Sequence, residues 1–133
     1  MSEENVELVR RFVVAFNESN LDALYELTTL DFEFAPYLAT LIETTVYRGH
    51  DGLRRYFADV DAAWGTIRVR LDEVRDLGDQ VFSAGELYGK GRSSGLEVTI
   101  PLAWIGESRG GEISRLRSFV SRTAALQAVG LEE

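Results

Sequence analysis

The pattern of apolar and polar positions divides the chain into a helical first half and a β-rich second half. Apolar residues recur at intervals of three and four over residues 3–18, the spacing of a helix that buries one face. A second, shorter helix is predicted over residues 21–27, after the polar stretch 17–20. Alternation with a period of two begins at residue 66 and continues to residue 120, which predicts a succession of β-strands.

Shorter elements are predicted in the middle of the chain. A strand over residues 31–36 ends at Pro36, because proline has no N–H to donate to a neighbouring strand. Residues 37–47 are apolar with several threonines, and we predict a loop that leads into a short edge strand over residues 44–48. A glycine-containing turn at residues 49–52 then precedes a third helix over residues 53–63.

The four strands of the second half are predicted to be long. They cover residues 66–75, residues 80–90 and the two arms of 97–120, which we expect to be joined by a turn at 106–111. A final helical segment over residues 122–129 ends at Gly130. Since a long hairpin is stable only within a larger sheet that is covered on one face, the pattern predicts a single α+β domain over residues 1–133.

Composition and charge narrow the class of protein. Hydrophobic residues make up 45% of the chain and charged residues 27%, as in globular proteins. No apolar run approaches the ~20 residues of a membrane span, and the acidic N-terminus is unlike a signal peptide, so we expect a cytoplasmic protein without a membrane partner. The absence of cysteine excludes disulfides and thiolate metal sites.

The net charge of −8, from 14 basic and 22 acidic residues, argues against nucleic acid as a partner. Arg68, Arg70, Arg115 and Arg117 are candidates for a local basic stripe. A solvated or interface face of the sheet explains them more simply.

Short motifs follow one another in a fixed order along the whole chain. They are Arg11–Asn17 with Leu21-Asp22, Asp31–Phe34, Tyr47–Phe57, Gly78–Val81, Gly111–Ile113 leading into Arg117–Phe119, and Ala124–Leu131. Together they resemble the nuclear transport factor 2-like superfamily and, within it, the SnoaL-like proteins. The resemblance implies a cone-shaped fold, in which a curved antiparallel sheet wraps the N-terminal helices around a pocket. It also implies a homodimer formed through the outer face of the sheet.

Members of this superfamily include ketosteroid isomerases, limonene-epoxide hydrolases, polyketide cyclases, dehydratases and binding proteins without catalysis. The isomerases use a helix tyrosine, a carboxylate base and a protonated Asp, and the matching positions here carry no such group. They are Phe12 for the tyrosine, Phe57 for its support, Ala35 or Pro36 for the base, and Pro101 or Ala103 for the Asp. The resemblance therefore predicts the fold and leaves the activity open.

The two other enzymatic patterns are also incomplete. The Arg-x-Asp of the epoxide hydrolases falls at Gly85-Glu86-Leu87, and their second acid falls at Ser118. The acid of the polyketide cyclases is sought near Ser118 or Ser121, and both are serines.

Side chains expected to face the pocket are mostly apolar, Leu87 and Val120 among them, with two small hydroxyls. This is the usual composition of a small-molecule site, although the same residues are also suited to fill a core. The predicted ligand-binding residues are Phe12, Phe16, Phe34, Tyr37, Phe57, Trp64, Ser83, Trp104, Leu116 and Ser118.

Three residues, Glu86, Glu43 and His50, are candidates for an acid or base at an unexpected position. Alternation places Glu86 on the outer face of the sheet, where we expect a structural ion pair with Arg68, Arg70 or Arg117. His50 is the only histidine, and a capping or surface role is its simplest interpretation. No metal or organic cofactor is expected.

Three functions remain open at this point. The favoured one is a pocket protein that binds a small hydrophobic molecule, polycyclic molecules included. The second is a SnoaL-like enzyme of the cyclase, isomerase or dehydratase type with a non-standard acid or base. The third is an interaction domain that dimerises and whose cone is filled by side chains.

Overall fold

One curved sheet organises the residues that the computed structural model describes, which are 2–36 and 46–131. Its six strands follow the order β2-β1-β6-β5-β4-β3, with β1 and β6 parallel and all other neighbours antiparallel. The strands are β1 (Thr28–Ala35), β2 (Tyr47–Arg48), β3 (Trp64–Asp76), β4 (Gln80–Gly91), β5 (Glu97–Arg109) and β6 (Glu112–Phe119). The sheet stays open at both edges, and the predicted α+β cone is confirmed.

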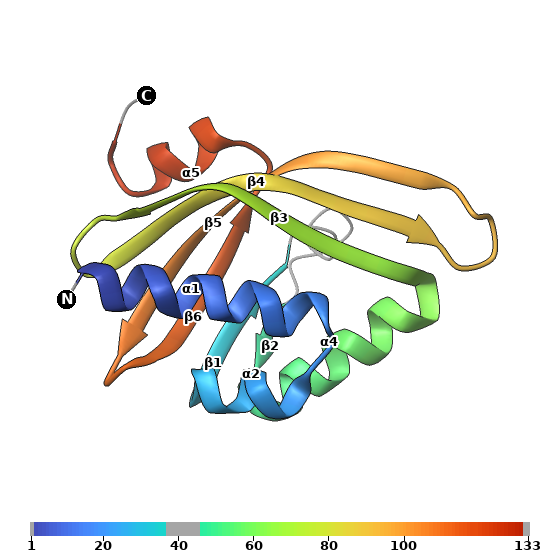
Figure 1. The fold of residues 1–133 in the computed structure, drawn as a ribbon, viewed down its shortest axis with the longest axis horizontal. Helices are drawn as coiled ribbons and strands as arrows, with labels where there is room; N and C mark the ends of the chain where they lie inside the picture. The colour runs from blue at the N-terminus through green and yellow to red at the C-terminus, as the bar shows by residue number, and fades with distance from the viewer. Residues whose placement is uncertain (1, 37–45, 132–133) are drawn as a thin grey trace.

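The helices cover the two faces of this sheet unequally (Figure 1). Three lie on its inner side: α1 (Ser2–Asn17), α2 (Leu21–Leu27) and α4 (Gly49–Ala63). The short α5 (Arg122–Ala128) lies on the outer side, over β4, β5 and β6. None of these described helices is long and apolar enough to cross a membrane.

The main core lies between α1 and the inner face of the sheet. Leu8, Phe12, Ala15 and Phe16 form a stripe at helical spacing along α1, and all four are buried. Phe12 and Phe16 each place their rings 5.9 Å from the ring of Trp104 on β5, in edge-to-face contact. Since burying a Phe side chain contributes ~1.5–3 kcal/mol, this stripe is a principal reason why α1 stays on the sheet.

A second, smaller core lies beneath α5 on the outer face. Ala125 and Leu126 of the helix pack against Phe82, Ala84, Ala103 and Ile105. The sequence pattern predicted inner and outer faces correctly for β4, because Leu87 belongs to the main core and Phe82 to the second core. Val120, predicted to face inward, is instead 50% exposed.

Glycines account for the largest differences between predicted and observed boundaries. The stretch predicted as a turn at 49–52 is the first turn of α4, which begins at Gly49 with φ +70°. Gly52 packs so closely that a Cβ there would lie 2.7 Å from the carbonyl carbon of Tyr47. The turn predicted at 106–111 contracts to Gly110-Gly111, and Gly106 lies inside β5.

Strand lengths also differ at the start of the sheet. β1 begins at Thr28, three residues before the predicted start. The predicted edge strand 44–48 corresponds to β2, Tyr47–Arg48, while residues 44 and 45 lie outside the described part of the chain.

Asn17, the last residue of α1, joins this helix to the edge strand β3. Its Nδ2 donates to the carbonyl oxygen of Val69, and the Val69 N–H donates to its Oδ1, both at 2.8 Å. The side chain thus satisfies two backbone groups of an edge strand as a neighbouring strand would. The two residues are 52 positions apart in the sequence, so this contact ties the helix end to the sheet.

The variant Asn17→Ala should lower the free energy of unfolding by about 1–3 kcal/mol, because it leaves two part-buried backbone groups of Val69 without partners. Urea unfolding followed by circular dichroism measures the change. Gln127→Ala, at an exposed position of α5, is the control and should change stability by less than about 0.5 kcal/mol. Equal effects of the two variants would contradict the assigned role of Asn17.

Candidate functional site

Ser83, Trp104 and Ser118 form a row across the inner face of β4, β5 and β6. Ser83 pairs with Trp104, and Trp104 pairs with Ser118, in the register of the sheet. The hydroxyls of both serines are buried and have no hydrogen-bond partner among the described residues. The large ring of Trp104 therefore lies between two unpaired polar groups.

Most of the predicted ligand-binding residues are part of the packed core. Phe12, Phe16, Phe34, Ser83, Trp104 and Leu116 are at most 2% exposed. Their aromatic rings contact one another, with Phe16 and Phe34 6.3 Å apart between centroids. The structure therefore brings these residues together as predicted, but as neighbours in a tightly packed cluster. Their role in ligand binding stays a prediction.

Phe57 and Trp64 are both partly exposed, and Phe57 packs at the border of this cluster against Phe16. They border a cavity of about 60 Å³, which we call the mouth cavity. Its lining comes from the end of α1, the end of α4 and the start of β3: Phe16, Ser19, Tyr56, Phe57, Val60, Asp61, Trp64, Gly65 and Ile67. Tyr37 lies outside the described residues.

The aromatic walls of the mouth cavity stand at steep angles to one another. The rings of Tyr56 and Phe57 are 5.2 Å apart with an interplanar angle of 82°, and those of Phe16 and Phe57 are 5.4 Å apart at 57°. Trp64 lies over Gly89 of β4, where a Cβ would approach its ring to 3.1 Å. The glycine therefore provides the room that the indole needs on the sheet.

Asp61 and Arg92 form the rim of the mouth cavity. Arg92 Nη2 lies 2.6 Å from Asp61 Oδ1, and Arg92 Nε donates to the backbone oxygen of Asp61 at 2.7 Å. These bonds join the end of α4 to the loop between β4 and β5. Sequence reasoning did not single out Asp61. The available signal was its position four residues after Phe57 and three before Trp64, which is helical spacing.

Tyr56 is the most deeply buried ionisable residue of the mouth cavity. Burial raises the pKa of its hydroxyl well above the ordinary value, and the neighbouring Tyr47 raises this pKa further. The hydroxyl of Tyr47 donates to Asp59 Oδ2 at 2.7 Å. Tyr56 is therefore a hydrogen-bond donor at neutral pH and not a base.

Of the candidate acids and bases, Glu86 and His50 lie away from the mouth cavity. Glu86 is on the outer face of β4 and pairs with Arg70 at 2.9 Å, so the predicted ion pair is confirmed, although both side chains are half-exposed. The ring of His50 stacks on Tyr25 at 4.6 Å, and its Nε2 lies 3.4 Å from the carbonyl oxygen of Thr28. Glu43 lies outside the described residues. No cluster of metal-ligating side chains occurs in residues 2–36 and 46–131.

The arginines considered as a basic stripe do not form one. Arg68 and Arg70 are on β3, whereas Arg115 and Arg117 are on β6, with two strands between them. Arg70 is also bonded to Asp72, and Arg115 lies 3.5 Å from Glu107. The outer face therefore carries paired charges of both signs.

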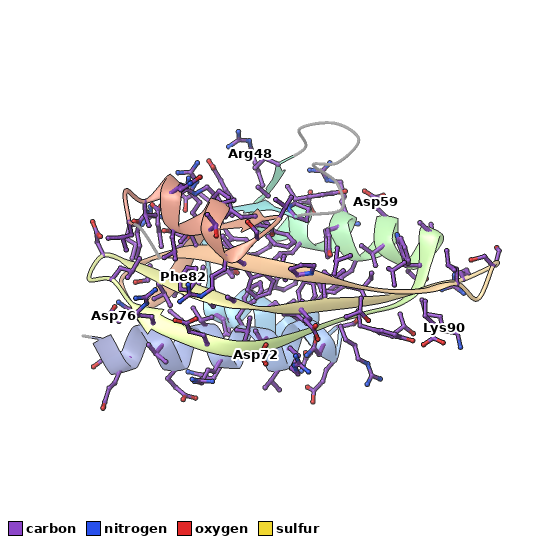
Figure 2. The ribbon with its side chains drawn as sticks, turned by 90° about the horizontal axis from the view of Figure 1, so that it is seen from above. Arg48, Asp59, Asp72, Asp76, Phe82 and Lys90 are labelled. Carbon is purple, nitrogen blue, oxygen red and sulfur yellow. The ribbon has the colours of Figure 1, made fainter. Side chains whose placement is uncertain are left out.

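The outer face has a covered part and an uncovered part. Figure 2 shows Phe82 close to α5, whereas Lys90 lies at the far end of the β4–β5 arm. A homodimer through this face stays a prediction, and the part available to it is the one beyond α5.

The chain is similar in sequence to one family of known proteins. A family model described as SnoaL-like domain matches residues 9–116. No curated protein sequence matches the chain.

Solved structures share the architecture. A protein of ketosteroid isomerase-like fold from Catenulispora acidiphila, in complex with trimethylamine, has a TM-score of 0.75 and 22% identity, covering 94% of this chain and 93% of its own. TerC co-crystallised with polyporic acid has a TM-score of 0.78 and 19% identity, with coverages of 93% and 96%. A protein from Jannaschia sp. proposed to be a SnoaL-like polyketide cyclase has a TM-score of 0.75 and 19% identity, with coverages of 99% and 95%. At these identities the likeness concerns the fold.

The buried hydroxyl of Tyr56 should make stability depend on pH in the alkaline range. Its pKa is raised in the folded state above the value of about 10 in the unfolded chain, so the folded state binds the proton more tightly. The contribution of the protonated Tyr56 hydroxyl to the free energy of unfolding is fully present below pH ~10 and is lost as the pH rises further. Urea unfolding between pH 8 and 11 should show a steeper loss of stability for the natural chain than for Tyr56→Phe. Parallel curves would contradict this assignment.

Proposed function

This chain belongs to the SnoaL-like domain family, and we propose that it binds a small, largely apolar molecule at the mouth cavity without acid–base catalysis. The observation that carries the proposal is the convergence of four aromatic side chains on a cavity that is open to solvent: Phe16, Tyr56, Phe57 and Trp64. Of these four, Phe57 and Trp64 are partly exposed and Phe16 and Tyr56 are buried, so the two exposed rings supply the contact area for a ligand at a small cost in conformational entropy.

The size of the mouth cavity limits what enters it. Its volume of about 60 Å³ is less than half of the ~150 Å³ of an engineered cavity that admits benzene. A ligand therefore inserts one compact end, and the rest of the molecule lies outside, along the rim formed by Asp61 and Arg92. A polycyclic ligand is accommodated in this way only if it carries a narrow substituent.

The ionisable groups of the mouth cavity favour binding over catalysis. Tyr56 retains its proton at neutral pH, and Asp61 is paired with Arg92. Glu86 faces the opposite side of the sheet, where it pairs with Arg70. General acid–base catalysis requires a group within hydrogen-bond reach of the substrate and with a pKa near the working pH. The described residues of the cavity offer no pair of this kind.

Related structures support a role in binding small molecules. The protein from Catenulispora acidiphila is in complex with trimethylamine, and TerC was crystallised with polyporic acid. This fold accommodates small molecules of different chemistry. It is therefore suited to a binding protein whose own side chains determine which ligand enters its cavity.

Trp64 provides both a wall of the mouth cavity and a reporter. Titration with a panel of small apolar amines, alcohols and phenols should change the tryptophan emission, to which the buried Trp104 adds a background, and raise the melting temperature in a saturable way. Trp64→Phe leaves only the emission of Trp104 but keeps an aromatic wall, so the emission change should be lost while the thermal shift persists. Trp64→Ala removes the wall and should weaken binding by about tenfold or more.

The control variant is Val14→Ala, which lies on the exposed side of α1, away from the mouth cavity. It should leave ligand binding unchanged. A thermal shift that Trp64→Ala does not reduce would place the ligand elsewhere and contradict the proposal. Conversion of a bound compound, detected by mass spectrometry and lost in Asp61→Asn, would instead establish an enzyme.

A further inference from the structure

We infer that the outer face of the sheet carries a binding site for the carboxylate group of a small organic acid, in a notch between β1 and β6. This outer notch has a volume of about 70 Å³. It is lined by Glu33, Ala35, Val46, Arg115, Leu116 and Arg117. Since it lies on the opposite side of the sheet from the mouth cavity, the inference goes beyond the proposed function and does not depend on it.

Alternation along two paired strands brings two arginines to the outer notch. Phe34 of β1 and Leu116 of β6 are partners in the register of the sheet, and both belong to the main core on the inner face. The next pair, Ala35 and Arg117, therefore points to the outer face. Arg115 shares that face, because it lies two residues before Arg117 on the same strand. One strand thus places two guanidinium groups beside the same notch.

Arg117 is an exception to the paired charges of the outer face. Its partners in the register of the sheet are Ala35 on β1 and Ile105 on β5, and both are apolar. None of the ion pairs within residues 2–36 and 46–131 includes Arg117, and its Nε is buried without a hydrogen-bond acceptor. Buried N–H groups are almost always bonded in folded proteins, and a carboxylate oxygen is a strong acceptor for this one.

An aromatic ring holds the guanidinium of Arg117 in place. The Cζ of Arg117 lies 5.6 Å from the centre of the Phe119 ring, in a cation–π contact. Phe119 itself packs against the second core beneath α5. A guanidinium held in this way loses little conformational entropy when an anion binds, and its planar fork of donors matches the two oxygens of a carboxylate.

The other charges of the outer notch leave it with an excess of positive charge. Glu33 is compensated from the neighbouring strand β2, where Arg48 Nη1 lies 2.6 Å from its Oε2. Arg115 lies 3.5 Å from Glu107, which is longer than the ~2.7–2.9 Å of a charge-assisted hydrogen bond. The net charge of −8 opposes non-specific binding of anions elsewhere on the surface. Binding of a carboxylate therefore reports a local site.

The volume of the outer notch suits a carboxylate group. About 70 Å³ is roughly twice the ~30 Å³ that a water molecule occupies in the liquid, and less than half of the ~150 Å³ of a cavity that admits benzene. A flat carboxylate of three heavy atoms fits this space, and the remainder of the acid lies on the outer surface of the sheet.

The decisive experiment compares isobutyrate with isobutyramide, its neutral isostere, by NMR at pH 7, with sodium chloride at equal ionic strength as the salt control. The Nε–H resonance of Arg117, assigned by its loss in Arg117→Gln, reports on the outer notch. We expect isobutyrate to shift this resonance in a saturable way and to bind at least about tenfold more tightly than the amide. Equal effects of isobutyrate and isobutyramide overturn the inference. A shift confined to the indole N–H of Trp64 places the anion at the mouth cavity and overturns it as well.

Three variants separate the outer notch from the charge of the surface, with affinity measured from the backbone amides of β1 and β6. Arg117→Gln should weaken isobutyrate binding by about tenfold or more, and Arg115→Gln, at a half-exposed position, by roughly threefold. Arg68→Gln makes the same change in net charge on β3, with two strands between it and β6, and should leave the affinity within about twofold. Circular dichroism checks that each variant is folded, and Arg115→Gln decides the test if Arg117→Gln is not. Equal losses in the notch variants and in Arg68→Gln overturn the inference.

Discussion

The bond pair between Asn17 and Val69 determines where α1 ends on the sheet, and the mouth cavity depends on that position. Asn17 follows Phe16 directly, so the two hydrogen bonds of the amide hold the Phe16 ring against Tyr56 and Phe57. The same residue ends α1, which places the negative end of the helix beside the cavity. One polar side chain at the sheet edge thus positions both an apolar wall and a partial charge.

The interior of the cone and its mouth differ in how strongly they are held. The interior is a cluster of interlocking aromatic and aliphatic side chains, in which any change of volume costs several kcal/mol, with ~2–5 typical for a large-to-small substitution. The rim depends on the exposed ion pair between Asp61 and Arg92, and such pairs contribute only ~0–1 kcal/mol. Regions of low local stability are those that can adapt to a ligand, which supports the proposal that a ligand binds at the mouth.

The sequence predicted the parts of this structure that depend on local periodicity. Alternation placed Glu86 on the outer face of the sheet and Leu87 on the inner face, and helical spacing predicted that one face of α1 is buried. It failed where a tertiary contact accompanies a glycine: Gly52 packs on Tyr47 within the first turn of α4, and Gly106 lies inside β5, where it pairs with Val81. Asp61 was missed for the same reason, since its partner Arg92 lies 31 residues away.

The electrostatics of the mouth cavity bear on chemistry as well as on binding. Isomerase and cyclase reactions develop negative charge on oxygen, and enzymes stabilise it with N–H donors, helix N-termini or cations. The mouth cavity is bordered instead by the C-terminal ends of α1 and α4, and the guanidinium at its rim, Arg92, is already bonded to Asp61. A difference between catalytic and binding members of this fold therefore requires no change of fold, only of which helix ends and side chains meet at the mouth.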